Sequence, residues 1–124
     1  MSTLTPSIIE QIAGKIREHR SHLMDELRIH DAVEGVLQST GIEYVREHPL
    51  SGRLRLDFWL PHSSTAIEVK RGNFRSAYLH QIARYLDESS VQAIILIALR
   101  IDHDIPTVLR EKPVHHLELW RYLL

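Results

Sequence analysis

Residues 65–72, TAIEVKRG, have the alternating pattern of a β-strand that ends at a glycine. The two central apolar residues fall on one face of this strand, and Glu68 and Lys70 fall on the other, because successive side chains point to opposite sides. After Gly72 the apolar residues change to helical spacing, which predicts a helix over residues 74–89. The stretch therefore predicts a strand followed by a crossover helix, as in units with parallel strands.

The segments on either side complete a sheet. Residues 42–50 and 53–60 also alternate, and the short turns between the strands predict an antiparallel meander with residues 65–71. Asp57 is predicted on one face of the second strand, and the other face is apolar, with Leu54, Leu56, Phe58 and Leu60. Residues 91–99 are almost all apolar, the pattern of a strand covered on both faces, and we expect this strand to lie parallel to residues 65–71.

Two helices are predicted before the sheet. Residues 6–19 and 21–40 have apolar residues at helical spacing, and a short helix after Pro106 and a last strand at residues 116–122 are expected. The predicted fold class is α/β with an αβββαβ core, in which helices flank a mixed central sheet. We expect residues 1–124 to form a single domain with a core at about 21–100, to which the helix at about 6–19 and a C-terminal tail at about 101–124 are additions.

Composition limits the class of protein. The chain has 124 residues and no cysteine, which excludes disulfides and thiolate metal sites and favours a cytoplasmic location. Residues 1–15 lack the pattern of a signal peptide, and the longest apolar run, residues 93–99, is too short to span a bilayer, so we expect no membrane partner. The formal net charge of −1 argues weakly against free-standing nucleic-acid binding, which usually requires a basic surplus.

Two carboxylates are predicted to lie next to each other. If the strands at 53–60 and 65–71 pair, Asp57 can lie beside Glu68, and two carboxylates about 4 Å apart repel by about 4 kcal/mol at an effective dielectric near 20. A divalent cation relieves this repulsion, and all-oxygen ligands favour Mg²⁺ or Mn²⁺. Lys70 shares the face of Glu68 and would lie beside the metal as a point charge with movable donors, a role that arginine does not fill.

A third carboxylate is expected from the helix at residues 21–40. Glu26 projects close to the middle of the apolar face of this helix, where a charge is costly unless it is paired or bound to a metal. Glu34 lies nearer the rim of that face and is the alternative. His30 is one turn beyond Glu26 and shares its side.

Residues suited to a phosphate backbone follow on the helix at residues 74–89. Gln81 and Tyr85 are four residues apart and share one face, where an amide and a hydroxyl suit phosphate or sugar oxygens. Arg75 and Arg84 are near them in sequence and could add phosphate contacts. Two further arginines flank Asp57 on its strand, and phosphate contact and simple ion pairing are both open for them: Arg53 and Arg55.

The ordered pieces RLDF, IEVKRG and HQIARYLD resemble the PD-(D/E)XK nuclease superfamily, and the spacing of Gln81 and Tyr85 resembles its RecB-like QxxxY branch. The resemblance covers about residues 25–99. One departure is the residue before Asp57, which is Leu56 where the family pattern has proline. The resemblance implies a restriction-endonuclease-like fold.

The resemblance also implies a mechanism. Asp57 and Glu68 would bind Mg²⁺ (or Mn²⁺) together with the backbone carbonyl of Val69, while Lys70 would orient or polarise the attacking water. Glu26 would hold a second ion or its water shell. Water would then hydrolyse a DNA phosphodiester bond and leave a 5′-phosphate and a 3′-hydroxyl, by endonuclease or exonuclease action. The helix residues would position the DNA: Gln81, Tyr85, Arg84 and Arg75.

Two other functions stay open on the sequence alone. One is a non-catalytic subunit of the same fold that binds nucleic acid or protein, which the near-neutral charge favours. The other is a small structural subunit in which the motifs are coincidental. Because almost the whole chain is the catalytic core, a nuclease of this size would act as a homodimer or as a subunit of a larger nucleic-acid-processing complex, and the isoleucine-rich helix at residues 6–19 could be a partner surface.

Overall fold

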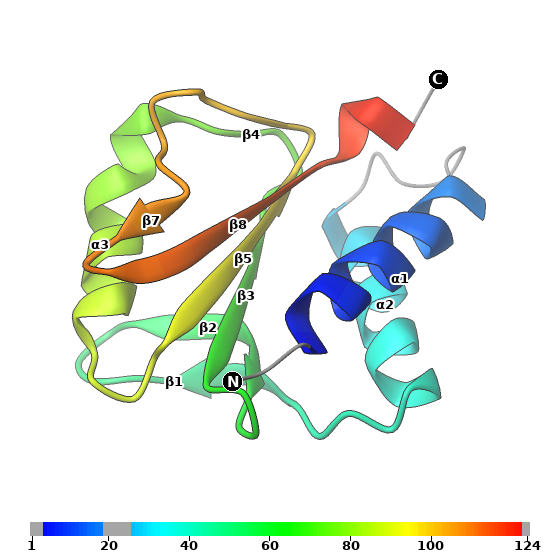
Figure 1. Ribbon diagram of the computed structural model, residues 1–124, viewed down its shortest axis with the longest axis horizontal. Helices are drawn as coiled ribbons and strands as arrows, with labels where there is room; N and C mark the ends of the chain where they lie inside the picture. Colours follow the sequence, from blue (N-terminus) through cyan, green and yellow to red (C-terminus); the bar gives the residue numbers. More distant parts are fainter. Residues whose placement is uncertain (1–3, 19–25, 123–124) are drawn as a thin grey trace.

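A six-stranded mixed sheet lies at the centre of the protein, and helices cover both of its faces (Figure 1). The computed structural model describes residues 4–18 and 26–122. The strands of the sheet are β1 (Val45–Pro49), β2 (Arg55–Leu60), β3 (Thr65–Val69), β5 (Ala93–Ala98), β7 (Val108–Leu109) and β8 (Lys112–Glu118). Their order across the sheet is β1-β2-β3-β5-β8-β7.

The strand directions agree with the predicted meander and crossover. β1, β2 and β3 are antiparallel neighbours, and β5 lies parallel to β3. β8 is parallel to β5, so the segment expected as a tail contributes a strand to the central sheet. A separate two-stranded parallel sheet is formed by β4 (Asn73–Phe74) and β6 (Arg100–Ile101).

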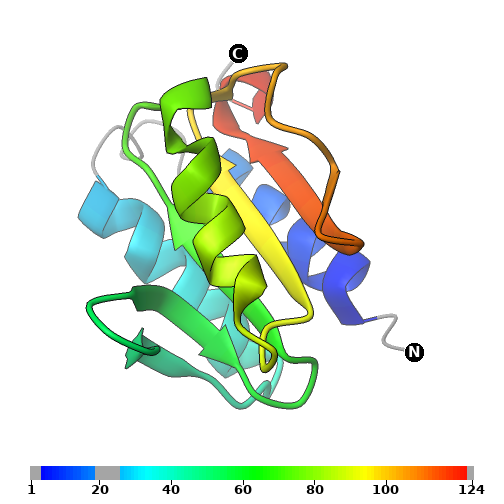
Figure 2. The same cartoon turned by 90° about the vertical axis from the view of Figure 1, so that its left-hand side faces the viewer.

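The helices form one layer on each face of the sheet (Figure 2). α1 (Leu4–Glu18) and α2 (Glu26–Ser39) lie on one face, and α3 (Leu79–Asp87) lies on the other after a short 3₁₀ turn, η2 (Ser76–Tyr78). The predicted α/β class and the order αβββαβ are thus observed, while residues 19 and 21–25 of the predicted helices lie outside the described residues. Within residues 4–18 and 26–122, no helix is long and apolar enough to cross a membrane.

The sheet separates two apolar cores. On one side, side chains of α1 and α2 pack against Phe58, Ile67 and Ile95. On the other side, α3 packs against strand residues that include Ala66 and Ile94. Every residue of β5 is buried, which confirms the prediction that this strand is covered on both faces.

The prediction for β2 is wrong in one respect, because its apolar residues do not share a face. Phe58 belongs to the core beneath α1 and α2, whereas Leu56 belongs to the core beneath α3. The change occurs at Asp57, and the residue across from it on β1, Glu47, has a φ of 53°, outside the strand region. A sequence pattern assumes regular pleating and cannot show this local departure.

The C-terminal segment also differs from the prediction. The short helix expected after Pro106 is absent from the described structure, and β7 and β8 form a hairpin there instead. Its two-residue turn, Arg110-Glu111, has φ values of 55° and 62°, the geometry that closes tight hairpins but usually requires Asn or Gly. The last strand therefore begins at Lys112, earlier than predicted, and the chain continues as a 3₁₀ turn, η3 (Leu119–Tyr122).

Two isoleucines of α1 are part of the core. Ile8 and Ile12 are fully buried and belong to the cluster beneath α1 and α2. Because these two side chains already pack within the protein, they are not available to the partner surface predicted for the helix at residues 6–19.

Candidate active site

Asp57 and Glu68 meet at the point where the pairing of β2 and β3 ends. The last pair in the register is Phe58 with Ile67, so Asp57 and Glu68 come next on the two strands. The Asp57 N–H donates to Glu68 Oε1 at 2.9 Å, and the Val69 N–H donates to Asp57 Oδ2 at 2.7 Å. The two carboxylates thus make reciprocal hydrogen bonds across the strands, and the predicted proximity of these residues is observed.

These hydrogen bonds change the interpretation of the pair. A charged acceptor strengthens a backbone hydrogen bond to about 1.5–3 kcal/mol, which offsets part of the repulsion between two carboxylates. Glu68 is buried, at 8% exposed, while the Asp57 side chain is 24% exposed. A cation is therefore not the sole means by which this fold can tolerate the pair.

Lys70 follows directly after β3 and lies on the α3 side of the sheet. Its N–H donates to the Ile97 carbonyl at 2.8 Å, which continues the pairing with β5 and holds the backbone in place. Its ammonium group lies 4.4 Å from the centroid of the Tyr78 ring. This cation–π contact holds the charged end of Lys70 beside α3 while the side chain remains only half-buried.

Tyr85 connects α3 to β2, the strand that carries Asp57. Gln81 Nε2 donates to the Tyr85 hydroxyl at 3.2 Å, as the four-residue spacing predicts, and the hydroxyl donates to the Arg55 carbonyl at 3.4 Å. Burial and, to a smaller extent, the negative charges of Glu68 and Asp57 raise the pKa of Tyr85 to about 12. Tyr85 is therefore a neutral hydroxyl close enough to both carboxylates to feel their charge.

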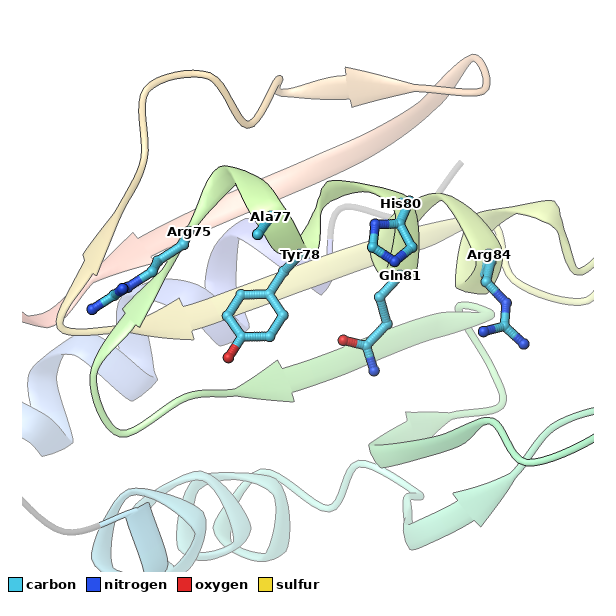
Figure 3. A pocket seen from close by; sticks show the side chains of 6 residues that line it. All are labelled: Arg75, Ala77, Tyr78, His80, Gln81 and Arg84. Atoms are coloured by element: carbon cyan, nitrogen blue, oxygen red, sulfur yellow. The ribbon is translucent and has the colours of Figure 1, made fainter.

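A basic hollow lies along α3 next to these residues. It has a volume of about 420 Å³ and is lined by Arg75, Ala77, Tyr78, His80, Gln81 and Arg84. Figure 3 shows Tyr78, Gln81 and Arg84 pointing to the same side of the helix, with Arg75 at its N-terminal end. Two of the lining residues contact other candidate site residues: Tyr78 contacts Lys70, and Gln81 contacts Tyr85.

The remaining predicted site residues lie on α2, on β2 and in the turn before β2. Arg53 is exposed in the turn before β2, and Arg55 Nη1 donates to the Glu47 carbonyl at 3.1 Å. Glu26 is the first residue of α2, but its side chain lies outside what the structure describes. Glu34 accepts hydrogen bonds from Tyr44 at 2.7 Å and Arg46 at 3.0 Å.

His30 is the functional candidate to which the sequence argument gave no role. It is buried at 8% exposed, and its Nε2 lies 3.9 Å from Asp57 Oδ2. The sequence places His30 one turn beyond Glu26 on the inward side of the helix. It does not show that this part of the helix faces β2.

The donor set fits an oxygen-ligated cation in part. Among the residues that the structure describes, no three His, Asp or Glu side chains form a group with metal-binding geometry. Asp57 and Glu68 would therefore need further oxygen ligands, which Mg²⁺ commonly takes from water, phosphate or a backbone carbonyl such as that of Val69. An ionised carboxylate has two oxygens and about four acceptor positions, so one backbone hydrogen bond does not use up its capacity.

The fold and the site together define an α/β protein with a carboxylate pair at the end of the β2–β3 pairing, a lysine two residues beyond Glu68 that contacts Tyr78, and a basic hollow along α3. No protein-family model, curated protein or solved structure gives a significant match to the chain. The proposals below therefore depend on the chemistry of the described residues and on the resemblance noted in the sequence.

Proposed function

We propose that the protein is a metal-dependent nuclease of the PD-(D/E)XK superfamily, with a restriction-endonuclease-like fold, that hydrolyses DNA phosphodiester bonds. The observation that carries the proposal is the placement of Asp57, Glu68 and Lys70. The carboxylates occupy neighbouring positions on β2 and β3, and the lysine follows two residues later on the side that α3 covers. Metal-assisted hydrolysis of a phosphodiester uses oxygen ligands to hold the ion, and a lysine near the ion could orient the attacking water.

Asp57 and Glu68, with the Val69 carbonyl, are the residues that would hold Mg²⁺ (or Mn²⁺). The ion would supply a Lewis acid that stabilises charge on the phosphate oxygens. Lys70 has three N–H donors and would orient the attacking water, whose oxygen bonds to phosphorus as the bond to the leaving oxygen breaks. Its ammonium lies 4.4 Å from the centroid of the Tyr78 ring, at the start of α3.

The hollow along α3 would hold the DNA backbone. Arg75 and Arg84 supply charge and Gln81 supplies an amide, all groups that commonly contact phosphate oxygens. Tyr85 would act as a neutral donor, because its raised pKa of about 12 keeps the hydroxyl protonated at physiological pH. These residues would position the scissile phosphate over the carboxylates and take no part in bond cleavage.

The direct test is incubation of the protein with linear, circular, single-stranded and branched DNA, with EDTA, Mg²⁺ or Mn²⁺. We expect cleavage only with a divalent cation, and loss of cleavage in Lys70→Ala. Lys112→Ala is the matched control, because Lys112 is a half-buried lysine that donates to the carbonyls of Leu86 and Glu88 and is remote from the carboxylates in sequence and contacts. Equal cleavage by Lys70→Ala and the parent would refute the proposed role, and circular DNA separates endonuclease from exonuclease action.

A non-catalytic binding module is the second candidate function. The observation that favours it is that both carboxylates already accept backbone hydrogen bonds, so a structural role is available to them. Titration calorimetry with Mn²⁺ separates the two functions. A binding module without a metal site gives no heat, whereas the proposed nuclease binds Mn²⁺ and loses that binding in Asp57→Asn.

A further inference from the structure

A second group of basic residues lies at the edge of the sheet where the parallel strands end. β3, β5 and β8 run in the same direction, so their C-terminal ends meet at one edge (Figure 1). Backbone hydrogen bonds join the segments that follow these strands. The Leu99 N–H donates to the Gly72 carbonyl at 2.8 Å, and the Trp120 N–H donates to the Leu99 carbonyl at 3.1 Å. This edge is where open α/β sheets commonly bind ligands.

Two arginines contact one tryptophan at this edge. The guanidinium carbon of Arg100, on β6, lies 4.6 Å from the centroid of the Trp120 ring, and that of Arg121 lies 4.8 Å from it. Both arginines are exposed, and Trp120 is half-buried. Because both distances end at the same ring, the two charges lie within about one Debye length of each other and act together on a ligand. These three residues form the Trp120 cluster.

The two arginines differ in how their charge is compensated. Glu118 Oε1 accepts hydrogen bonds from Arg121 Nε at 3.3 Å and Nη2 at 3.2 Å, and the other carboxylate oxygen accepts the Ile101 N–H at 3.0 Å. Within residues 4–18 and 26–122, no carboxylate forms an ion pair with Arg100. Arg100 therefore presents an uncompensated charge with five N–H donors next to an aromatic ring.

The Trp120 cluster continues the basic surface of the hollow along α3. Arg100 pairs with Asn73 in the two-stranded sheet, and both side chains are exposed, whereas the next pair, Phe74 and Ile101, is buried. Arg75 directly follows β4 and lies at the N-terminal end of the hollow (Figure 3). The basic surface thus extends from α3, by way of β4 and β6, to η3.

We propose that the Trp120 cluster is a platform for an unpaired nucleotide of single-stranded DNA. Proteins that bind single strands combine aromatic rings, on which bases stack, with cations that follow the phosphates. A base would stack on Trp120 in place of one guanidinium, which would turn to a neighbouring phosphate. Duplex DNA fits this platform less well, because its bases already stack on each other. The proposal rests on the proposed function for the choice of DNA, and it adds that the substrate has a single-stranded part.

The fluorescence of Trp120 tests the platform directly. The chain has two tryptophans, so Trp59→Phe leaves Trp120 as the only indole. The variant is titrated in EDTA with oligo(dT), with a duplex of the same length and with polyglutamate, and N-acetyltryptophanamide corrects for absorption by the DNA. We expect saturable quenching by oligo(dT) and clearly weaker quenching by the duplex. The absence of saturable quenching by oligo(dT), or equal quenching by the duplex, would overturn the proposal. Equal quenching by polyglutamate would also overturn it and would indicate an acidic protein partner.

The salt dependence of binding tests the two arginines. Binding of labelled oligo(dT) is followed by fluorescence anisotropy in a protein that retains both tryptophans. Arg100→Gln and Arg121→Gln should each reduce the slope of log K against log salt concentration by about 0.7, the value for one phosphate contact with a single strand. Arg110→Gln is the matched control, because Arg110 is also partly exposed, pairs with Asp87 at 2.8 Å and lies in the β7–β8 turn. Unchanged slopes in both cluster variants, or an equal reduction in Arg110→Gln, would overturn the proposal.

The outcome for the platform is separate from the outcome for the nuclease. If oligo(dT) quenches Trp120 but no DNA is cleaved with any divalent cation, the nuclease function fails and the platform stands. If DNA is cleaved and Trp120 is not quenched, the platform alone is refuted.

Discussion

Asp57→Asn separates the electrostatic and structural roles of the carboxylate pair. The substitution keeps an oxygen that can accept the Val69 N–H, which Asp57 now binds at 2.7 Å, but removes one of two adjacent negative charges. Two unit charges about 5 Å apart repel by about 3 kcal/mol at an effective dielectric near 20. Because the Asp57 side chain is 24% exposed, solvent and salt reduce this repulsion, and we take about half of it as the energy recovered.

A weaker hydrogen bond from the Val69 N–H offsets part of the energy recovered from the lower repulsion. Replacement of a charged acceptor by a neutral one costs about 1 kcal/mol. The two effects together predict that the metal-free variant is as stable as the parent or more stable by about 1 kcal/mol, which corresponds to a rise in Tm of up to about 5 °C for a chain of this size. A site that binds a cation should show the reverse order once Mn²⁺ is present, because a ligand at 100 times its Kd adds about 2.7 kcal/mol to the parent alone.

Thermal unfolding with EDTA and with Mn²⁺ measures both effects. Asp87→Asn is the control, because Asp87 is an exposed carboxylate paired with Arg110, so its neutralisation should lower Tm slightly and leave the response to Mn²⁺ unchanged. The reasoning is refuted if Asp57→Asn is destabilised by more than about 2 kcal/mol in EDTA and the parent shows no stabilisation by Mn²⁺. That result would mean that the carboxylates only secure the end of the β2–β3 pairing.

Three further predictions follow from the contacts of single residues. Lys70→Arg keeps the positive charge over the Tyr78 ring but should lose cleavage at least 100-fold, because a planar guanidinium cannot replace a point donor; unfolding by denaturant should shift by less than about 1 kcal/mol. Tyr85 has a pKa raised to about 12, so its stabilising effect is complete below pH 10 and is lost as pH rises toward 12; at pH 11 the parent should lose about 1.4 kcal/mol more than Tyr85→Phe in denaturant titrations. The pKa of His115 is lowered by burial and by the nearby His116, so the parent should lose stability as pH falls below about 6.5, and this loss should be smaller in His115→Gln.

The proximity of the carboxylates could be predicted because it depends only on strand pairing. Alternation along β2 and β3 and the short turn between them place Asp57 opposite Glu68 whatever the details of the packing. The spacing of Gln81 and Tyr85 predicts their contact for a similar reason, since residues four apart lie next to each other on any regular helix. These parts of the site follow from the periodicity of regular elements.

The other features depend on backbone geometry that has no periodic signal. The φ of 53° at Glu47 accompanies the change of face at Asp57, yet glutamate is not a residue that marks such a conformation. The hairpin turn at Arg110-Glu111 likewise uses two long side chains where Asn and Gly are typical, so the pattern after Pro106 indicated a helix. The contact of His30 with Asp57 joins α2 to β2 across the core, and its existence depends on how the helix is rotated against the sheet.

The basic residues of the protein are not spread evenly, and several of them line the hollow along α3. The net charge is −1, but within the described residues the hollow along α3 is lined by two arginines and a histidine and by no acidic side chain. With Lys70, the two arginines would make about three phosphate contacts, and the affinity would then fall about 40-fold between 50 and 200 mM salt, well below the change expected for six to ten contacts. With so few phosphate contacts, electrostatic attraction contributes less to DNA affinity than it does in proteins that make six to ten contacts. Under the proposed nuclease function, phosphate contacts beyond those of one chain would come from a second copy of the chain or from a larger complex, and the salt dependence of binding at known protein concentrations would show these contacts as a steeper slope.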